Sequence, residues 1–437
     1  IVVHPKGHNN QSLDLLDLVE ELQSRNLKLP LLIRFDDILE DRVNQLNIAF
    51  EKAIKTYQYN GKYKGVFPIK CNQQRHVVEK LISCGEKWNF GLEAGSKAEL
   101  LIALSIVKNP KSLLICNGYK DQKYIETAIL ARKIGRQPII VIEQVDEIDR
   151  IISASKKLGA APLIGIRAKL GSESSGHWGA TSGEKAKFGL SISNIILAID
   201  KLKKANLLKD LKLLHFHVGS QINNIAIIKD AIQEASQIYI ELKKLGAPMG
   251  HIDVGGGLGI DYDGSQTASN ASTNYSLQNY ANDVVATIKE CCKSNRIEDP
   301  IIVSESGRAI VSHFSILLFN ILGSDVRESS ISSIKKNESI LIQNLRDTLQ
   351  LINKLKQKSV IEGSELQEAW NDAIKFKEDV LTAFRLGYIK LQERAIAEQL
   401  TWACAHQLIE VLPKCKSIPK DLKQLPTTLS RIYYANL

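Results

Sequence analysis

The chain has 437 residues, of which 44% are hydrophobic and 24% are charged. This composition allows a large buried core and excludes wholesale disorder. The formal net charge of +9 comes from lysines scattered along the chain, without a basic run that contains interleaved aromatic residues, so we expect no nucleic-acid partner and favour small anionic ligands.

The length predicts more than one structural unit, because a single core rarely exceeds about 250–300 residues. The sequence contains no signal peptide and no run of 18 apolar residues, so we expect no membrane association. Its seven cysteines form no metal-binding spacing, and their odd number favours a reducing compartment and hence the cytoplasm. Because the chain opens on Ile1 and its only methionine is Met249, we expect it to begin after a natural start.

The first three quarters of the chain predict a barrel. Leucines at helical spacing occupy residues 1–29, and a short strand (30–35) and a helix (37–57) follow. Eight apolar runs then alternate with helical segments such as 97–106, and these runs end at Lys70, Glu93, Gly118, Glu143, Arg167, Gly219, Gly255 and Glu305. This alternation predicts a closed (β/α)8 barrel, and an open doubly wound sheet is the alternative that periodicity leaves open.

The remaining chain predicts a helical bundle. Apolar residues recur at helical spacing over 340–355, the pattern Ser364-x-x-Gln367 resembles a capping box, and a third helix over 391–412 ends at Pro413. We expect a helical insertion whose core includes Trp370, Phe384 and Trp402. Residues 431–437 predict a strand without a partner. The predicted domains are therefore 1–325 for the barrel with an N-terminal extension, 326–426 for the helical bundle, and 427–437 for the start of a β-domain.

Lys70 is the first candidate for chemistry. It closes the apolar run GVFPIK, and partial desolvation at the rim of a barrel favours a neutral amine. A neutral amine is what an imine with an aldehyde cofactor requires, so Lys70 is a candidate Schiff-base residue. The alternative is a surface lysine just beyond a strand.

Other polar groups also close predicted strands and should lie on the same rim. Glycines expose backbone N–H groups to a phosphate, a carboxylate can keep a pyridine nitrogen protonated, and an imidazole can pack on a ring. We expect His217 to face a ligand and His215 to be a hydrogen-bonded core residue. The simpler alternatives are a tight turn for the glycines and salt bridges for Glu305 and Arg308. The candidate groups are Glu93, Arg167, the run 215–220, the run 253–257 and the run 305–308.

Several longer motifs carry a resemblance to a known family. The stretches GVFPIKCNQQ, FGLEAGSKAEL, ICNGYKD, GEKAKFGL, HFHVGSQI, DVGGGLGIDYDGS and SESGRA resemble those of the biosynthetic arginine decarboxylases. These are pyridoxal-phosphate enzymes of the alanine-racemase-like class (fold type III). The shorter motifs are shared with ornithine and diaminopimelate decarboxylases, whereas the long ones favour the arginine enzymes.

The resemblance implies a role for each matching residue. Lys70 carries the cofactor as an imine, His217 stacks on its ring, and Glu305 pairs with the ring nitrogen; these three are the implied catalytic residues. The implied phosphate ligands are Ser220, Gly256, Gly257 and Arg308, and the further cofactor-binding positions are Glu93, Arg167, Gly255 and Gly307.

The resemblance also implies a substrate-binding stretch and further partners. Asp261 in this stretch can meet a cationic side chain or be a solvated turn residue. Magnesium and a homo-oligomer are implied without identified ligands or contacts. The stretch comprises Ile252, Asp253, Val254, Gly255, Gly256, Gly257, Leu258, Gly259, Ile260, Asp261 and Tyr262.

The sequence departs from the family near its end. The family's Cys-Asp-Ser-Asp-Gly motif and a tyrosine that touches the phosphate have no counterpart, and no Cys-Asp pair occurs in the 437 residues. We therefore expect a chain truncated at both ends, with most of the C-terminal β-domain missing, that binds pyridoxal phosphate and turns over slowly.

The implied activity is decarboxylation of L-arginine to agmatine and carbon dioxide in polyamine (putrescine and spermidine) biosynthesis. The alternatives are a non-catalytic cofactor-binding fragment or partner of a full-length relative, and a decarboxylase of ornithine, diaminopimelate or carboxynorspermidine.

Overall fold

The structure is a computed structural model that describes residues 1–7, 12–171, 187–325 and 338–436. It divides into two compact units, one of Ile1–Lys28 and Leu32–Leu317, and one of Leu29–Leu31 and Leu318–Leu437. The first four residues of the GEKAKFGL motif (183–186) and the predicted domain boundary at 326 lie outside the described residues. None of the described helices combines the length and apolar character that crossing a membrane requires.

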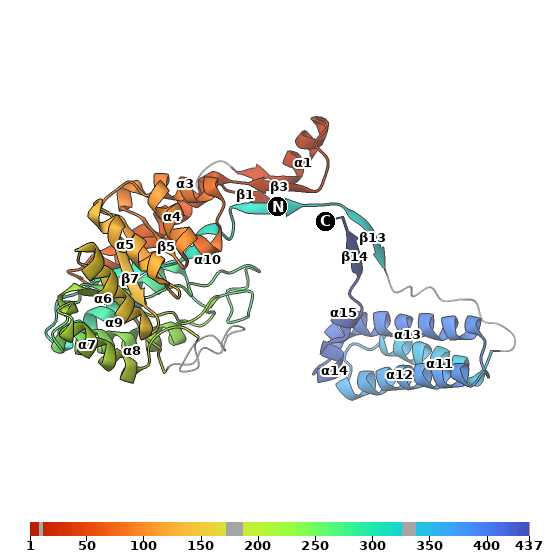
Figure 1. Ribbon diagram of the computed structural model, residues 1–437. Coiled ribbons are helices and arrows are strands. Elements are labelled where there is room, and N and C mark those ends of the chain that lie inside the picture. Colours follow the sequence, from red (N-terminus) through yellow and green to blue (C-terminus); the bar gives the residue numbers. More distant parts are fainter. Residues whose placement is uncertain (8–11, 172–186, 326–337, 437) are drawn as a thin grey trace. The chain divides into compact units, whose positions relative to one another are not determined.

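The first unit is a closed barrel of eight parallel strands (Figure 1). The strands pair in chain order, and the last closes against the first, where Ser304 lies opposite Gly65. The prediction of a (β/α)8 barrel is confirmed, and the open sheet is wrong. The strands are β4 (Tyr63–Pro68), β5 (Gly91–Ala94), β6 (Leu113–Cys116), β7 (Gln137–Ile142), β8 (Ile164–Arg167), β9 (Leu211–His215), β10 (His251–Asp253) and β11 (Ile301–Ser304).

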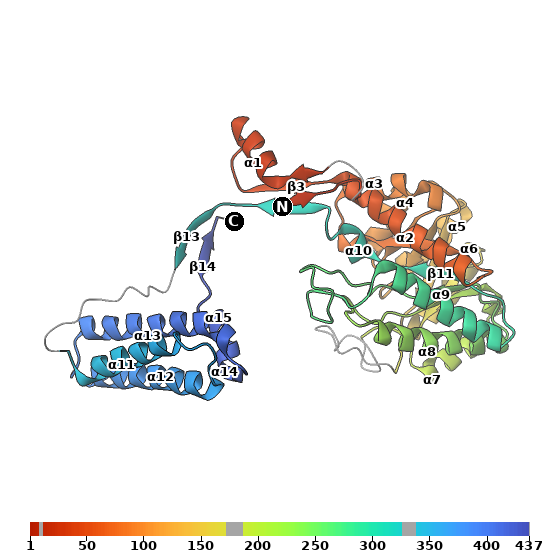
Figure 2. The ribbon, with the colours of Figure 1, turned by 180° about the vertical axis from the view of Figure 1, so that it is seen from behind.

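Helices surround the barrel, as the two opposite views show (Figure 1, Figure 2). Several begin at side chains that cap them: Ser96 accepts a hydrogen bond from the Glu99 N–H, and Asp121 accepts one from the Tyr124 N–H. The helices are α2 (Asp36–Thr56), α3 (Arg75–Cys84), α4 (Lys97–Ile106), α5 (Gln122–Lys133), α6 (Asp146–Leu158), α7 (Ile192–Lys204), α8 (Ile225–Lys244), α9 (Leu277–Ser294) and the short α10 (Gly307–Val311).

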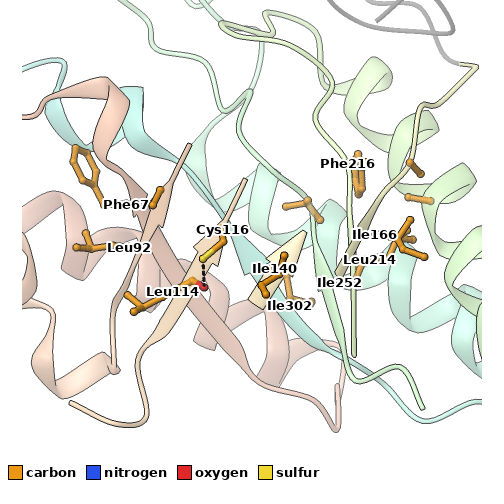
Figure 3. Close-up of a cluster of buried hydrophobic side chains, with 14 of the residues drawn as sticks. Phe67, Leu92, Leu114, Cys116, Ile140, Ile166, Leu214, Phe216, Ile252 and Ile302 are labelled. Atoms are coloured by element: carbon orange, nitrogen blue, oxygen red, sulfur yellow. Dashed lines mark hydrogen bonds between the residues drawn. The ribbon is translucent and has the colours of Figure 1, made fainter. Parts of the chain in front are cut away.

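The alternation of side chains along each strand builds two apolar layers. In β6, Leu113 and Ile115 belong to a small cluster with Val66 and Val303, whereas Leu114 and Cys116 belong to the large cluster shared with the helices. Figure 3 shows part of the large cluster, with side chains from strands around the barrel. Because both faces of each strand are buried, the strands read as continuous apolar runs.

The N-terminal extension lies outside the barrel sheet. It contains β1 (Val2–Val3) paired with β2 (Leu13–Asp14), and then α1 (Leu15–Ser24). The strand predicted at 30–35 is β3 (Leu31–Arg34), which forms a two-stranded sheet with β12 (Ser315–Leu318).

In its described residues, the second unit contains three long helices, α11 (Ile340–Leu355), α12 (Gly363–Arg385) and α13 (Leu391–Val411), and two short ones, α14 (Lys420–Lys423) and α15 (Leu425–Thr428). The capping box of α12 uses Glu362 and Glu365, two residues before the predicted pair, because the helix begins at Gly363. Trp370 and Trp402 pack on the apolar core as predicted. Phe384 does not; its ring lies beside the guanidinium of Arg394 instead.

The predicted strand near the end of the chain exists as β14 (Ile432–Ala435). The expectation that it finds no partner is wrong, because it pairs antiparallel with β13 (Ile321–Asp325), where Ser324 lies opposite Tyr433. Periodicity within one short segment cannot reveal a partner that lies more than a hundred residues earlier in the chain.

Candidate active site

Three neighbouring strands bring an amine and two carboxylates to one mouth of the barrel. Lys70 lies in a single 3-10 turn (Ile69–Cys71) directly after β4, Glu93 is in β5, and Glu305 directly follows β11. The Lys70 Nζ atom is 3.1 Å from Glu93 Oε2 and 3.8 Å from Glu305 Oε2. Half of the Lys70 side chain is exposed, whereas both carboxylates are buried. Lys70 is therefore accessible to solvent, and the two acidic groups beside it are not.

The amine carries a proton in this setting. Burial lowers the pKa of Lys70, but the charges of Glu305 and Glu93 raise it by more, so its pKa lies above the ordinary lysine value. The predicted neutral amine is therefore wrong for the chain without a bound cofactor. Desolvation was the only effect visible in the sequence, because the two carboxylates approach Lys70 from other strands.

Glu93 and Glu305 differ in their surroundings. Asn117, which follows β6, donates from Nδ2 to Glu305 Oε1 over 2.6 Å. Glu93 Oε2 contacts Lys70, but Oε1 is buried without a hydrogen-bond partner. Burial and the charge of Glu305 raise the pKa of Glu93 to about 7, against the opposing effect of Lys70. Asn117 was missed in the sequence, although its place directly after a predicted strand could have identified it.

His215 is a site residue as well as a buried one. Its Nδ1 lies 3.2 Å from Asp253 Oδ2 and 3.7 Å from Glu305 Oε1, with no exposed surface on the ring. Burial lowers the pKa of His215, but Asp253 and Glu305 raise it to a net value above the ordinary one. The predicted core position is confirmed, whereas the predicted hydrogen bond is not, because neither ring nitrogen has a hydrogen-bond partner. Sequence alone did not show that the ring faces two acids.

His217 lies beyond the end of β9, and its Nδ1 accepts a hydrogen bond from the Gly219 N–H over 3.0 Å. Burial, Arg167 and Lys70 all lower its pKa well below the ordinary histidine value, so the ring is neutral. A neutral, fixed imidazole offers a flat face without a charge.

The glycines after β10 form a close-fitting turn beside this ring. Gly255 has φ +65, and Asp253 Oδ1 accepts a hydrogen bond from its N–H over 2.9 Å. A Cβ atom at Gly255 would lie 2.2 Å from the Phe216 carbonyl oxygen, and one at Gly256 would lie 2.8 Å from His217 Nε2. Only glycine, which has no Cβ atom, allows the loops after β9 and β10 to lie this close together.

Arg308, in the first turn of α10, is hydrogen-bonded to residues of these loops. Its Nε and Nη2 donate to Ser220 Oγ over 3.2 and 3.0 Å, and its Nη1 donates to the Tyr262 hydroxyl over 3.1 Å. Gly307 allows α10 to approach the Lys70 turn, because a Cβ there would lie 2.6 Å from Cys71 Sγ.

Arg167 belongs to a network of buried charges. Its Nη1 lies 3.1 Å from Glu143 Oε2, and Glu143 Oε1 accepts a hydrogen bond from the Gly118 N–H over 2.7 Å. Next to it, the fully buried Lys120 is 3.3 Å from Glu147 Oε2. Lys120 and Glu147 could not be connected with the site from their sequence positions, because both follow strand ends by several residues.

Comparisons with known proteins show which family the chain matches. A model of the pyridoxal-dependent decarboxylase pyridoxal-binding domain matches residues 42–312, and one of the arginine decarboxylase helical bundle domain matches residues 335–426. The biosynthetic arginine decarboxylases of Parasynechococcus marenigrum WH8102 and Prochlorococcus marinus MIT 9313 are both 64% identical over all of this chain, which spans 68% and 67% of their lengths.

The chain belongs to the biosynthetic arginine decarboxylase family. The crystal structure of such an enzyme from Campylobacter jejuni superposes with a TM-score of 0.75 at 34% identity, covering 91% of this chain and 65% of that one. A diaminopimelate decarboxylase from Helicobacter pylori (TM-score 0.57, 23% identity) shares the fold.

The residues present fit the pyridoxal phosphate that this decarboxylase family uses. The buried and unpartnered Glu93 Oε1 and Asn117 Oδ1 are polar atoms that a bound group can satisfy. The glycine turn and the Arg308–Ser220 pair supply the N–H groups and positive charge that a phosphate needs.

The one cluster of possible metal ligands in the described chain does not fit magnesium. His215, Asp253 and Glu305 form the one group of three in the described chain whose ligand atoms lie within 4.8 Å of one another. Magnesium prefers oxygen ligands and keeps several waters, whereas this group is fully buried and includes an imidazole. We assign no metal to it.

The stretch 252–262 runs from the barrel core to an exposed loop. Ile252 is buried beneath the site, whereas Asp261 accepts hydrogen bonds from Ser272 Oγ over 2.7 Å and the Gln266 N–H over 3.3 Å. These bonds hold the loop as it stands, and contact of Asp261 with a substrate stays a prediction.

The glycine turn gives a direct test of the cofactor site. We expect Gly255→Ala to weaken pyridoxal phosphate binding by about tenfold or more, because the new methyl group pushes the β9 and β10 loops apart. The control is Gly135→Ala, whose φ of +82 carries the same backbone strain but whose Cβ meets nothing within 4 Å. Titration followed by absorbance measures both affinities. An equal loss of cofactor affinity in the two variants would contradict a role of the glycine turn in binding the cofactor.

Proposed function

We propose that this chain decarboxylates L-arginine to agmatine and carbon dioxide, a step of polyamine biosynthesis, with pyridoxal phosphate bound at Lys70. The observation that carries the proposal is the meeting of Lys70 with Glu305 across the mouth of the barrel, with Nζ and Oε2 3.8 Å apart. It is supported by the 64% identity to enzymes named biosynthetic arginine decarboxylases.

The residues around Lys70 suit this chemistry. When bound, pyridoxal phosphate supplies the electron sink for cleavage of the bond to the substrate carboxylate. Lys70 supplies the nitrogen that a substrate amine displaces. Glu305, fixed by Asn117, supplies a negative charge that can keep a ring nitrogen protonated. His217 supplies a neutral surface for the ring.

The phosphate would lie between the glycine turn and Arg308. Ser220 holds the guanidinium of Arg308 through two hydrogen bonds, so the positive charge is fixed before any ligand arrives. Arg167 and its partner Glu143 complete the polar rim. The cytoplasmic location, the magnesium requirement and the homo-oligomeric state stay predictions from the resemblance.

Substrate choice tests the proposal. The purified chain, loaded with pyridoxal phosphate, should release carbon dioxide from arginine about a hundredfold faster than from ornithine, diaminopimelate or carboxynorspermidine, since a site matched to one polar group rejects others strongly. Trapped carbon dioxide measures the rates. A preference for another of these amino acids would replace arginine as the substrate.

The competing hypothesis is a non-catalytic partner of a full-length relative. It predicts cofactor binding without carbon dioxide release from any of the four compounds, together with co-elution of the chain and the full-length protein. Release of carbon dioxide by the chain alone, lost in Lys70→Ala, would exclude it.

A further inference from the structure

The amine of Lys70 cannot attack an aldehyde while it carries its proton. Glu93 and Glu305 both favour the ammonium form, and the amine lies within 4 Å of each. A group close to Nζ must therefore take this proton when the amine reacts and return it when Lys70 is released.

Of the two carboxylates, Glu93 is the better placed to accept the proton. Its Oε2 is 3.1 Å from Nζ, within hydrogen-bond distance, whereas Glu305 Oε2 is 3.8 Å away. Glu305 also already accepts a hydrogen bond from Asn117 and lies 3.7 Å from His215 Nδ1. Glu93 Oε1 is buried without a hydrogen-bond partner. Burial and Glu305 favour its acid form, against Lys70 and the weaker effect of Asn117.

We propose that Glu93 is a catalytic residue that exchanges one proton with Lys70 during capture and release of the cofactor aldehyde. The proton moves from the ammonium to Glu93, the nitrogen lone pair forms a bond to the aldehyde carbon, and the aldehyde oxygen leaves as water. When a substrate amine takes over this carbon, Glu93 returns the proton to Lys70. This role rests on the proposed function.

The surroundings of Glu93 favour such exchange. Its side chain is fully buried, and Glu305 lies close by, so both effects raise the pKa of Glu93 once Lys70 no longer carries a positive charge. The acid form is then stable beside a neutral nitrogen, and the proton stays where the returning amine needs it.

The test compares the chain with its Glu93→Gln variant. We expect Glu93→Gln to capture pyridoxal phosphate about a hundredfold more slowly, measured by imine absorbance in stopped flow, because general base catalysis typically contributes that much. If Glu93 only holds Lys70 as an ammonium, the variant frees the amine and captures the cofactor faster. The two readings therefore predict opposite directions, and faster or unchanged capture would overturn the proposal.

A second readout needs no cofactor. In Glu93→Gln, Lys70 should react faster with trinitrobenzenesulfonate at neutral pH, located by peptide mapping, because one attracting charge is gone. Faster labelling together with slower capture separates proton transfer from damage to the site, which would slow both. Glu290→Gln, an exposed position in α9, also removes one carboxylate charge, and we expect it to change neither labelling nor capture.

Two further variants keep the test decisive. If Glu93→Gln does not fold, Glu93→Ala replaces it as the variant without a carboxylate, and Glu93→Asp shows whether a shorter carboxylate restores capture. Capture by Glu93→Ala should be slow and should be accelerated by added formate, which can enter beside the half-exposed Lys70. Absence of any formate effect in a folded Glu93→Ala would count against the proposal. If the unaltered chain captures no cofactor, the proposed function fails; if it does and Glu93→Gln is not slower, only the role of Glu93 fails.

Discussion

Replacing Lys70 with alanine should abolish covalent capture of pyridoxal phosphate and, with it, carbon dioxide release from arginine. No other amine within 4 Å of Glu93 or Glu305 is found in the described chain, so no neighbour can take over. Borohydride reduction after incubation with the cofactor, followed by peptide mapping, should label Lys70 in the unaltered chain and nothing in this region of the variant.

The matched control is Lys97→Ala. Lys97 lies at the start of α4, after the neighbouring strand β5, and its exposed amine is paired with Asp121 at 3.0 Å. This variant should capture the cofactor like the unaltered chain. If borohydride instead fixes the cofactor to Lys97 or to scattered surface lysines, Lys70 is not the imine residue.

The Lys70→Ala variant should also differ from the unaltered chain in how its free energy of unfolding depends on pH. Without Lys70, burial and Glu305 raise the pKa of Glu93 against the weaker effect of Asn117 alone, so its folded pKa lies further above its unfolded value. A group of this kind stabilises the fold at low pH, and this contribution is lost as pH rises through the folded pKa. The free energy of unfolding of Lys70→Ala should therefore fall above neutral pH relative to the unaltered chain, by at most about 1.4 kcal/mol per pH unit for one proton.

The strand-end residues of the site were predictable because the carboxyl ends of all eight parallel strands of a barrel lie on one rim. Once eight apolar runs are recognised, the residues that close them must share one rim, and this reasoning alone brings Lys70, Glu93 and Glu305 together. The structure places one carboxylate oxygen of Glu93 and one of Glu305 within 4 Å of the Lys70 amine. Helix bounds were equally accessible, since the predicted helix 97–106 matches α4.

The electrostatic state of the site was not predictable in this way. Whether Lys70 is charged depends on the distances to two carboxylates from separate strands, and those distances follow from register and side-chain rotamers. His215 illustrates the same limit, since two-residue alternation gives the face of a strand but not the acids opposite that face. The β13–β14 pairing joins segments too far apart in sequence for local patterns to connect.

Glu305→Gln should lower the rate of carbon dioxide release from arginine by about a hundredfold to a thousandfold, the range seen when one preorganised electrostatic group is removed. The amide keeps the shape and can still accept from Asn117, so the change removes charge and little else. Affinity for the cofactor should fall much less, because the proposed phosphate-binding groups, Arg308 and the glycine turn, are untouched. Glu290→Gln, an exposed position in α9, serves as control and should leave both quantities unchanged. Single-turnover release measures the rate and absorbance titration the affinity; a rate within a factor of about three of the unaltered chain would mean that Glu305 does not support the electron sink.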